Sequence, residues 1–139
     1  MDTPLRVLLV EDNPGDALLI RDGLTAEPGE CALEVAATMR DAEAAAGRSL
    51  FDVVLLDLQL PDSRGIVTLR RALAAWPATP IVVLTGLDDD EVGAALIEEG
   101  AHDYVVKDEL SERRLRRAVR FAVQRAQRSE EHTSELQSR

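Results

Sequence analysis

The amino-acid sequence predicts one α/β domain, a doubly wound parallel sheet of five strands with five helices, in the strand order 2-1-3-4-5. Short apolar runs alternate five times with segments of helical pattern, which is typical of parallel strands joined by right-handed crossovers. The length of 139 residues also suits a single domain with a hydrophobic core.

Five apolar runs are expected to form the strands. They lie at 5–10, 33–36, 51–56, 81–84 and 102–106. The third run ends in Val-Val-Leu-Leu without polar alternation, as expected for a central strand that is covered on both faces.

Five further segments are expected to be helices. They span 14 to about 25, 39 to about 46, 66–76, 88–99 and 110 to about 127. Asn13 before Pro14 is a typical helix N-cap followed by proline at the first helical position. The acidic residues 88–91 favour a helix start because they oppose the positive end of the helix dipole. Residues 61–65, which are rich in turn formers, are expected to be loop.

The C-terminal segment differs in character from the rest of the chain. The stretch from Arg128 to Ser138 reads RSEEHTSELQS and continues no apolar periodicity. It resembles the translation of a sequencing-library adapter. We therefore expect a domain at residues 1–127 and a non-native or disordered tail at residues 128–139. The natural chain is expected to continue beyond Gln127 into a further domain.

Composition limits the functional classes. The formal net charge of −10 disfavours binding to nucleic acid or to an anionic membrane. A single cysteine, Cys31, excludes an internal disulfide and a thiolate metal cluster. No segment is apolar and long enough to span a bilayer, and no secretory signal is apparent. A cytoplasmic location is the expectation.

Reactive side chains follow four of the predicted strands. Glu11 and Asp12 come after the first strand, Asp57 ends the third and Thr85 ends the fourth. Lys107 ends the fifth, and it is the only lysine beside fifteen arginines. Because sites in open α/β sheets form at the carboxyl ends of the strands, we expect these side chains to converge.

The predicted cluster suits a hard cation and phosphoryl chemistry. Carboxylates this close need a proton or a cation between them, and oxygen ligands without His or Cys favour Mg²⁺. The carbonyl of Gln59 can add a further oxygen. A metal-neutralised carboxylate can attack a phosphoryl group, while Mg²⁺ and the Lys107 ammonium stabilise the charge on the phosphoryl oxygens. The Thr85 hydroxyl can bond to one of those oxygens.

Four motifs give the chain a family resemblance. They are Val-Glu-Asp-Asn at 10–13, Leu-Asp-Leu-Gln-Leu-Pro at 56–61 with Gly65, Leu-Thr-Gly at 84–86 and Gly-Ala-His-Asp-Tyr-Val-Val-Lys at 100–107. With these motifs, the chain resembles the receiver domain of a bacterial two-component response regulator from Leu5 to Gln127. The resemblance implies the flavodoxin-like version of the predicted fold.

The resemblance also implies a role for each site residue. Asp57 is the implied phosphoacceptor, and Glu11 and Asp12 are the implied metal-binding acids. Lys107 is the implied phosphoryl-contacting base. Thr85 and Tyr104 are the implied switch pair.

The resemblance implies partners as well. The phosphoryl donor would be a histidine kinase or a histidine phosphotransfer protein. A homodimer would form through the fourth helix, the fifth strand and the fifth helix.

One position departs from the family pattern. Asp108 follows Lys107 where the family usually has a proline after a cis peptide bond. Because a cis bond before a non-proline residue costs about 3 kcal/mol, we expect a trans bond here. A lysine followed by Asp or Gly at this place resembles the pattern in receiver domains of multidomain sensors.

Other functional readings are weaker. A phosphatase with an aspartate nucleophile needs an acid two positions later, where this chain has Gln59, so an enzyme is not expected. No glycine-rich nucleotide-binding motif follows the first strand. A phosphate-independent interaction module of the same fold remains the alternative. The arginines of the last helix are expected to form a solvated face or to pair with acids across a dimer, rather than to contact DNA. Those expected to point mostly outward are Arg113, Arg116, Arg117 and Arg120.

Overall fold

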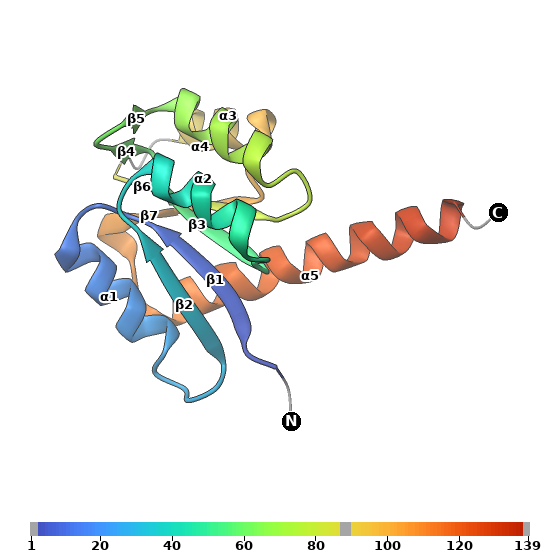
Figure 1. The fold of residues 1–139 in the computed structure, drawn as a ribbon, viewed down its shortest axis with the longest axis horizontal. Helices are drawn as coiled ribbons and strands as arrows, with labels where there is room; N and C mark the ends of the chain where they lie inside the picture. The colour runs from blue at the N-terminus through green and yellow to red at the C-terminus, as the bar shows by residue number, and fades with distance from the viewer. Residues whose placement is uncertain (1–2, 87–89, 138–139) are drawn as a thin grey trace.

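A five-stranded parallel sheet forms the centre of the molecule in the computed structural model, which describes residues 3–86 and 90–137, with side chains for 3–86 and 92–128. Its strands are β1 (Leu5–Val10), β2 (Cys31–Ala36), β3 (Val53–Asp57), β6 (Ile81–Thr85) and β7 (Asp103–Val106). The strand order β2-β1-β3-β6-β7 confirms the predicted topology (Figure 1).

Helices cover both faces of this sheet. They are α1 (Pro14–Leu24), α2 (Met39–Arg48), α3 (Ile66–Ala75), α4 (Asp90–Glu99) and α5 (Glu112–Gln137). The helices α1 and α5 pack on one face, and α2, α3 and α4 pack on the other. Helix α5 continues past its predicted end at about Gln127 and extends away from the body of the domain (Figure 1). The predicted helix start at Asp88 and Asp89 lies outside the described residues.

The segment after β3 contains more structure than the sequence predicted. Two short strands, β4 (Gln59–Leu60) and β5 (Ser63–Arg64), pair in antiparallel fashion, and β5 lies within residues 61–65, the stretch expected to be loop. Gly65 has a φ of 67° and donates its backbone N–H to the carbonyl of Leu58 over 2.8 Å. This positive φ suits glycine, and it lets the chain turn from the hairpin into α3.

The hydrophobic core has two layers, one on each side of the sheet. Leu55 belongs to the layer beneath α1 and α5, whereas Val54 and Leu56 belong to the layer beneath α2, α3 and α4. Consecutive residues of a strand point to opposite faces, so the unbroken apolar run of β3 fills both layers.

The turn between β1 and α1 is fixed by a helix cap. The Asn13 side chain accepts hydrogen bonds from the backbone N–H groups of Gly15 and Asp16 over 2.9 and 3.0 Å. Pro14 occupies the first helical position, as predicted. The cap therefore holds the residues that follow β1 at the carboxyl edge of the sheet.

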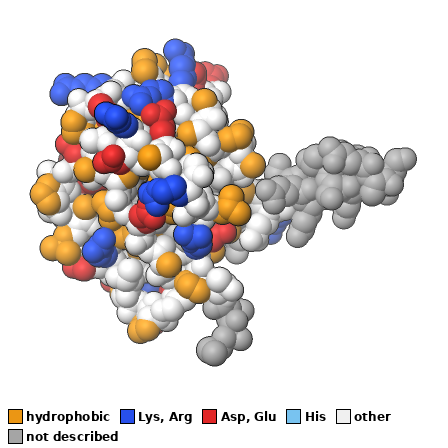
Figure 2. Space-filling model, in the orientation of Figure 1, with side chains coloured by type: hydrophobic (Ala, Val, Ile, Leu, Met, Phe, Trp, Pro, Cys, Tyr) orange, Lys and Arg blue, Asp and Glu red, His pale blue; other side chains and the backbone are white. Residues whose placement is uncertain are grey.

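The surface carries charges of both signs. Figure 2 shows acidic, basic and hydrophobic side chains interspersed over the face turned to the viewer. Among the described helices, none is both long and apolar enough to cross a membrane.

Candidate functional site

Three carboxylates meet at the carboxyl edge of the sheet. Oxygen atoms of Glu11, Asp12 and Asp57 all lie within 4.8 Å of one another. Glu11 directly follows β1 and Asp57 ends β3, and these strands are neighbours in register, with Val10 opposite Leu56. Glu11 and Asp57 are 2% and 5% exposed, whereas Asp12 is exposed. The strand order thus brings together the acids that the sequence analysis singled out.

Lys107 lies against this acidic cluster. Its Nζ atom is 2.7 Å from Glu11 Oε2 and 2.9 Å from Asp57 Oδ2. Lys107 opens a short 3₁₀ turn, η1 (Lys107–Glu109), at the end of β7. The structure contains no cis peptide among the described residues, so the expected trans bond between Lys107 and Asp108 is confirmed.

A fourth acid, Asp16, also contacts the lysine. Its Oδ2 atom is 3.1 Å from Lys107 Nζ, and its side chain is 38% exposed. The sequence analysis missed Asp16. No pattern in the sequence singles out Asp16, because its contact joins the first turn of α1 to Lys107 at the end of β7.

Backbone groups complete the setting of the two buried acids. The N–H of Gln59 donates to Asp57 Oδ1 over 2.9 Å, and the N–H of Asn13 donates to Glu11 Oε1 over 3.0 Å. The predicted ligand Gln59 therefore lies next to Asp57, with its side chain exposed. Each buried carboxylate is held by one backbone donor and by Lys107.

Burial and ion pairing oppose each other in this cluster, and the net result is a raised pKa for both Glu11 and Lys107. Burial raises the pKa of Glu11 from 4.5 to about 7, although Lys107 and the Asn13 N–H act against the shift. For Lys107, burial alone would lower the pKa, but the bonds to Glu11, Asp57 and Asp16 outweigh it and raise the pKa above 10.5. The site therefore holds a firmly protonated ammonium beside a carboxyl that titrates near neutrality.

The donor set fits a divalent hard cation. The three clustered acids supply oxygen atoms alone, which Mg²⁺ prefers over the nitrogen and sulfur ligands that select zinc. The raised pKa of Glu11 reflects negative charge that is costly to bury. A bound cation would remove that cost, so the residues present fit the predicted Mg²⁺ site.

The predicted switch residues lie beside the cluster on the next two strands. Thr85 ends β6 and is 7% exposed, and β6 pairs directly with β3. Tyr104 lies on β7 opposite Val83, and its half-buried ring packs into the core layer beneath α4. Both residues thus lie on the strands β6 and β7, between Asp57 on β3 and the contact with α4.

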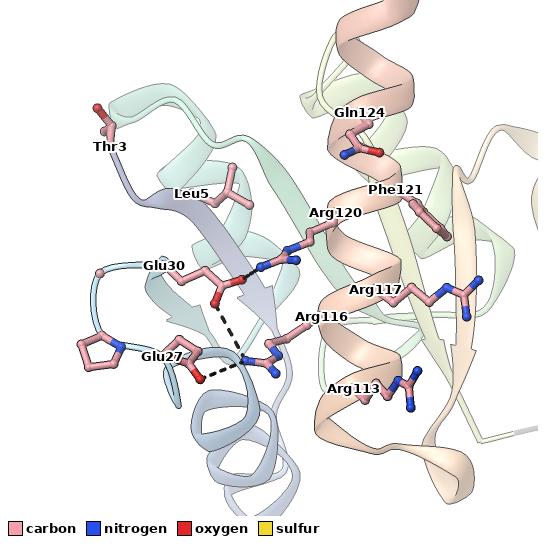
Figure 3. A pocket seen from close by; sticks show the side chains of 12 residues that line it. Thr3, Leu5, Glu27, Glu30, Arg113, Arg116, Arg117, Arg120, Phe121 and Gln124 are labelled. Carbon is pink, nitrogen blue, oxygen red and sulfur yellow. Dashed lines mark hydrogen bonds and ion pairs between the residues drawn. The ribbon is translucent and has the colours of Figure 1, made fainter. Parts of the chain in front are cut away.

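Four arginines of α5 line a separate hollow of about 1070 Å³. Figure 3 shows Arg116 and Arg120 pointing toward Glu27 and Glu30, while Arg117 points away from them. Arg116 lies 4.0 Å from Glu27 and 3.8 Å from Glu30, and Arg120 pairs with Glu30. Two of the predicted surface arginines therefore pair with acids of their own chain. The hollow also includes the start of β1, so it lies at the opposite sheet edge from the acidic cluster.

Comparison with known proteins places this chain in a family. Residues 7–120 match the response regulator receiver domain. The chain belongs to this family, whose members work in two-component signalling.

Curated relatives show the same relationship over part of their length. A protein-glutamate methylesterase/protein-glutamine glutaminase from Anaeromyxobacter dehalogenans is 39% identical over 109 residues, which cover 76% of this chain and 31% of that protein. The regulatory protein LuxO from Vibrio cholerae is 34% identical over 118 residues, which cover 85% of this chain and 25% of that protein. The chain thus spans between a quarter and a third of these relatives.

Solved structures share the fold along most of the chain. A signal receiver domain from Vibrio parahaemolyticus is 30% identical with a TM-score of 0.79, covering 91% of this chain and 95% of that one. A CheY-like receiver domain protein from Methanospirillum hungatei has a TM-score of 0.78 at 24% identity, covering 91% of this chain and 98% of that one. The second likeness shows the fold alone.

Proposed function

We propose that this receiver domain is a phosphoacceptor that takes a phosphoryl group on Asp57 from a histidine kinase or a histidine phosphotransfer protein. The observation that carries the proposal is the position of Lys107 Nζ, 2.9 Å from Asp57 Oδ2 and 2.7 Å from Glu11 Oε2. An ammonium at that place can stabilise charge on a phosphoryl group attached to Asp57.

The proposed reaction is a displacement at phosphorus. A carboxylate oxygen of Asp57 forms a bond to the phosphorus atom, and the bond from phosphorus to the donor histidine nitrogen breaks, leaving its electron pair on that nitrogen. Glu11, Asp12, Asp57 and the carbonyl of Gln59 would hold Mg²⁺, which neutralises phosphoryl charge when bound. Lys107 orients and stabilises the phosphoryl oxygens.

The proposed output is a shift between two conformations of one surface. Thr85 would bond to a phosphoryl oxygen, and Tyr104 would follow it, so that the surface of α4, β7 and α5 changes its preferred arrangement. This surface is also where we place a homodimer contact. We assign the domain a switching role in the cytoplasm rather than an enzymatic one, without binding to nucleic acid or membrane.

Phosphorylation of Asp57 is the test of this proposal. The protein is incubated with acetyl phosphate and Mg²⁺, and its intact mass is followed together with peptide mapping. We expect the mass of one phosphoryl group on the wild-type protein and none on the Asp57→Asn variant.

A matched control separates the site from acidic residues in general. Asp22 lies exposed on α1, so the Asp22→Asn variant should gain the phosphoryl mass as the wild type does. An unmodified wild type would contradict the proposal and favour the phosphate-independent interaction module. An Asp57→Asn variant that still gains the mass would contradict the assignment of Asp57 as the acceptor.

A further inference from the structure

Tyr104 packs onto a position of α4 that carries no side chain. Gly93 is buried in α4, and a Cβ atom built there would lie 2.5 Å from Tyr104 Cε1 and Oη and closer still to Cζ. Ordinary van der Waals contacts of a Cβ atom begin at about 3.4 Å. The ring therefore occupies space that any other amino acid at position 93 would fill.

The tyrosine backbone has little freedom to yield to such a side chain. Tyr104 pairs with Val83 in the parallel ladder of β6 and β7, and the ladder continues to Thr85 opposite Val106. The atoms that would clash belong to the far end of the ring. Rotation of the ring out of its place is therefore the easiest relief, because staggered side-chain rotamers are alternatives that leave the strand intact.

We propose that Gly93 is the positioning residue for Tyr104, because its missing side chain seats the ring against α4 and couples α4 to β7. The seat is the space over Gly93 that the ring fills. This inference rests on the proposed function, because it names the contact through which the switch residues would reach α4. It predicts that a methyl group at position 93 expels the ring and breaks that coupling.

The chain offers a clean probe, since Tyr104 is its only tyrosine. Full-length protein labelled with 3-fluorotyrosine gives one ¹⁹F resonance, and a soluble gadolinium chelate reports how far solvent reaches the ring. Without any phosphodonor, we expect the Gly93→Ala variant to show a shifted resonance and several-fold greater relaxation by the chelate than the wild type.

Gly47 supplies the matched control. It lies in α2, and a Cβ atom there meets nothing within 4 Å. The Gly47→Ala variant should raise the melting temperature, because alanine is the better helix former, and leave the ¹⁹F resonance unchanged. Gly93→Ala should lower the melting temperature in the wild-type background but raise it in a Tyr104→Ala background, where no ring remains to clash.

The outcomes separate this inference from the proposed function. A wild-type-like ¹⁹F resonance in Gly93→Ala, or an equal gain in melting temperature with and without Tyr104, would overturn the role of Gly93. With acetyl phosphate and Mg²⁺, Gly93→Ala should still gain phosphoryl mass on Asp57 but lose the amide shifts of α4 that the wild type shows. A wild type that gains no mass would contradict only the proposed function, because the ring measurement needs no donor.

Discussion

Lys107 is the residue on which the electrostatics of the site depend. One ammonium lies 2.7 to 3.1 Å from oxygen atoms of three carboxylates, Glu11, Asp16 and Asp57. One positive charge cannot balance three negative charges, and the effect is seen in the pKa of Glu11, the most buried of these acids. Burial raises the pKa of Glu11 to about 7.

As a first consequence, we expect the free energy of unfolding to depend on pH when divalent cations are absent. Between its ordinary pKa of 4.5 and about 7, Glu11 keeps a proton in the folded state that the unfolded chain has already released. Because the folded state binds more protons, stability falls as the pH rises through this window, by at most about 1.4 kcal/mol per unit. Urea unfolding in EDTA at several pH values between 5 and 7 measures the effect.

The Glu11→Gln variant should lose this dependence, since the amide does not titrate. Glu98→Gln, at an exposed position of α4, should retain the wild-type slope. Lys107 titrates well above the window and does not contribute. Equal slopes in the wild type and in Glu11→Gln would show that Glu11 does not titrate in this range.

At the scale of elements, one carboxylate links the hairpin after Asp57 to α2. Asp62 lies between β4 and β5, and its two oxygens accept the backbone N–H groups of Met39 and Arg40 over 2.8 and 2.9 Å. A burial effect that would raise the pKa of Asp62 is outweighed by these donors, so its pKa lies below 3.8. The hairpin that follows Asp57 is thus tied to the start of α2.

Removal of this link should destabilise the fold. An Asp62→Ala variant leaves two N–H groups of the first turn without their acceptor, and we expect a loss of about 0.5–2 kcal/mol in the free energy of unfolding at pH 7. Urea titration followed by circular dichroism measures it. Asp22→Ala, at an exposed position, is the control that should lose nothing. A cost for Asp62→Ala no larger than for the control would show that the contact of Asp62 with the start of α2 does not stabilise the fold.

The sequence predicted the elements well where periodicity is strong. The run of β3 and the Asn13–Pro14 helix start were recognisable because apolar spacing and capping are local properties. The hairpin of β4 and β5 was not predicted, because strands of two residues have no periodicity to detect. Helix α2 continues to Arg48, past its predicted end at about Ala46, since its last turn is exposed and carries no apolar signal.

At the scale of the whole molecule, the two core layers share the central strand. Leu55 and Leu56 are both fully buried, yet they face opposite layers of helices. A cavity on either side therefore weakens the same strand.

We expect Leu55→Ala and Leu56→Ala each to lower the free energy of unfolding by about 2–5 kcal/mol, within one cooperative transition. Coincident fluorescence and circular dichroism curves in urea test this. Leu50→Ala is the control, because Leu50 is 86% exposed. Two separate transitions would show that the layers unfold independently.

The site was predictable in outline because topology alone determines it. Once the strand order is known, residues that follow β1 and β3 must be neighbours, which places Glu11 beside Asp57. The contact of Asp16 with Lys107 and the close packing of Tyr104 on Gly93 depend on side-chain directions between distant elements. Such contacts leave no pattern along the chain.

The solitary lysine also determines how the folded protein reacts with reagents that acylate side-chain amines. Reagents that acylate side-chain amines need an unprotonated nitrogen, but Lys107 is held protonated by three acids and only 19% of its side chain is exposed. The other basic side chains that could replace it as targets are guanidinium groups and imidazoles. Dyes or supports that couple through lysine side chains would therefore react with unfolded molecules, whereas Lys107 of the folded protein would stay almost unmodified.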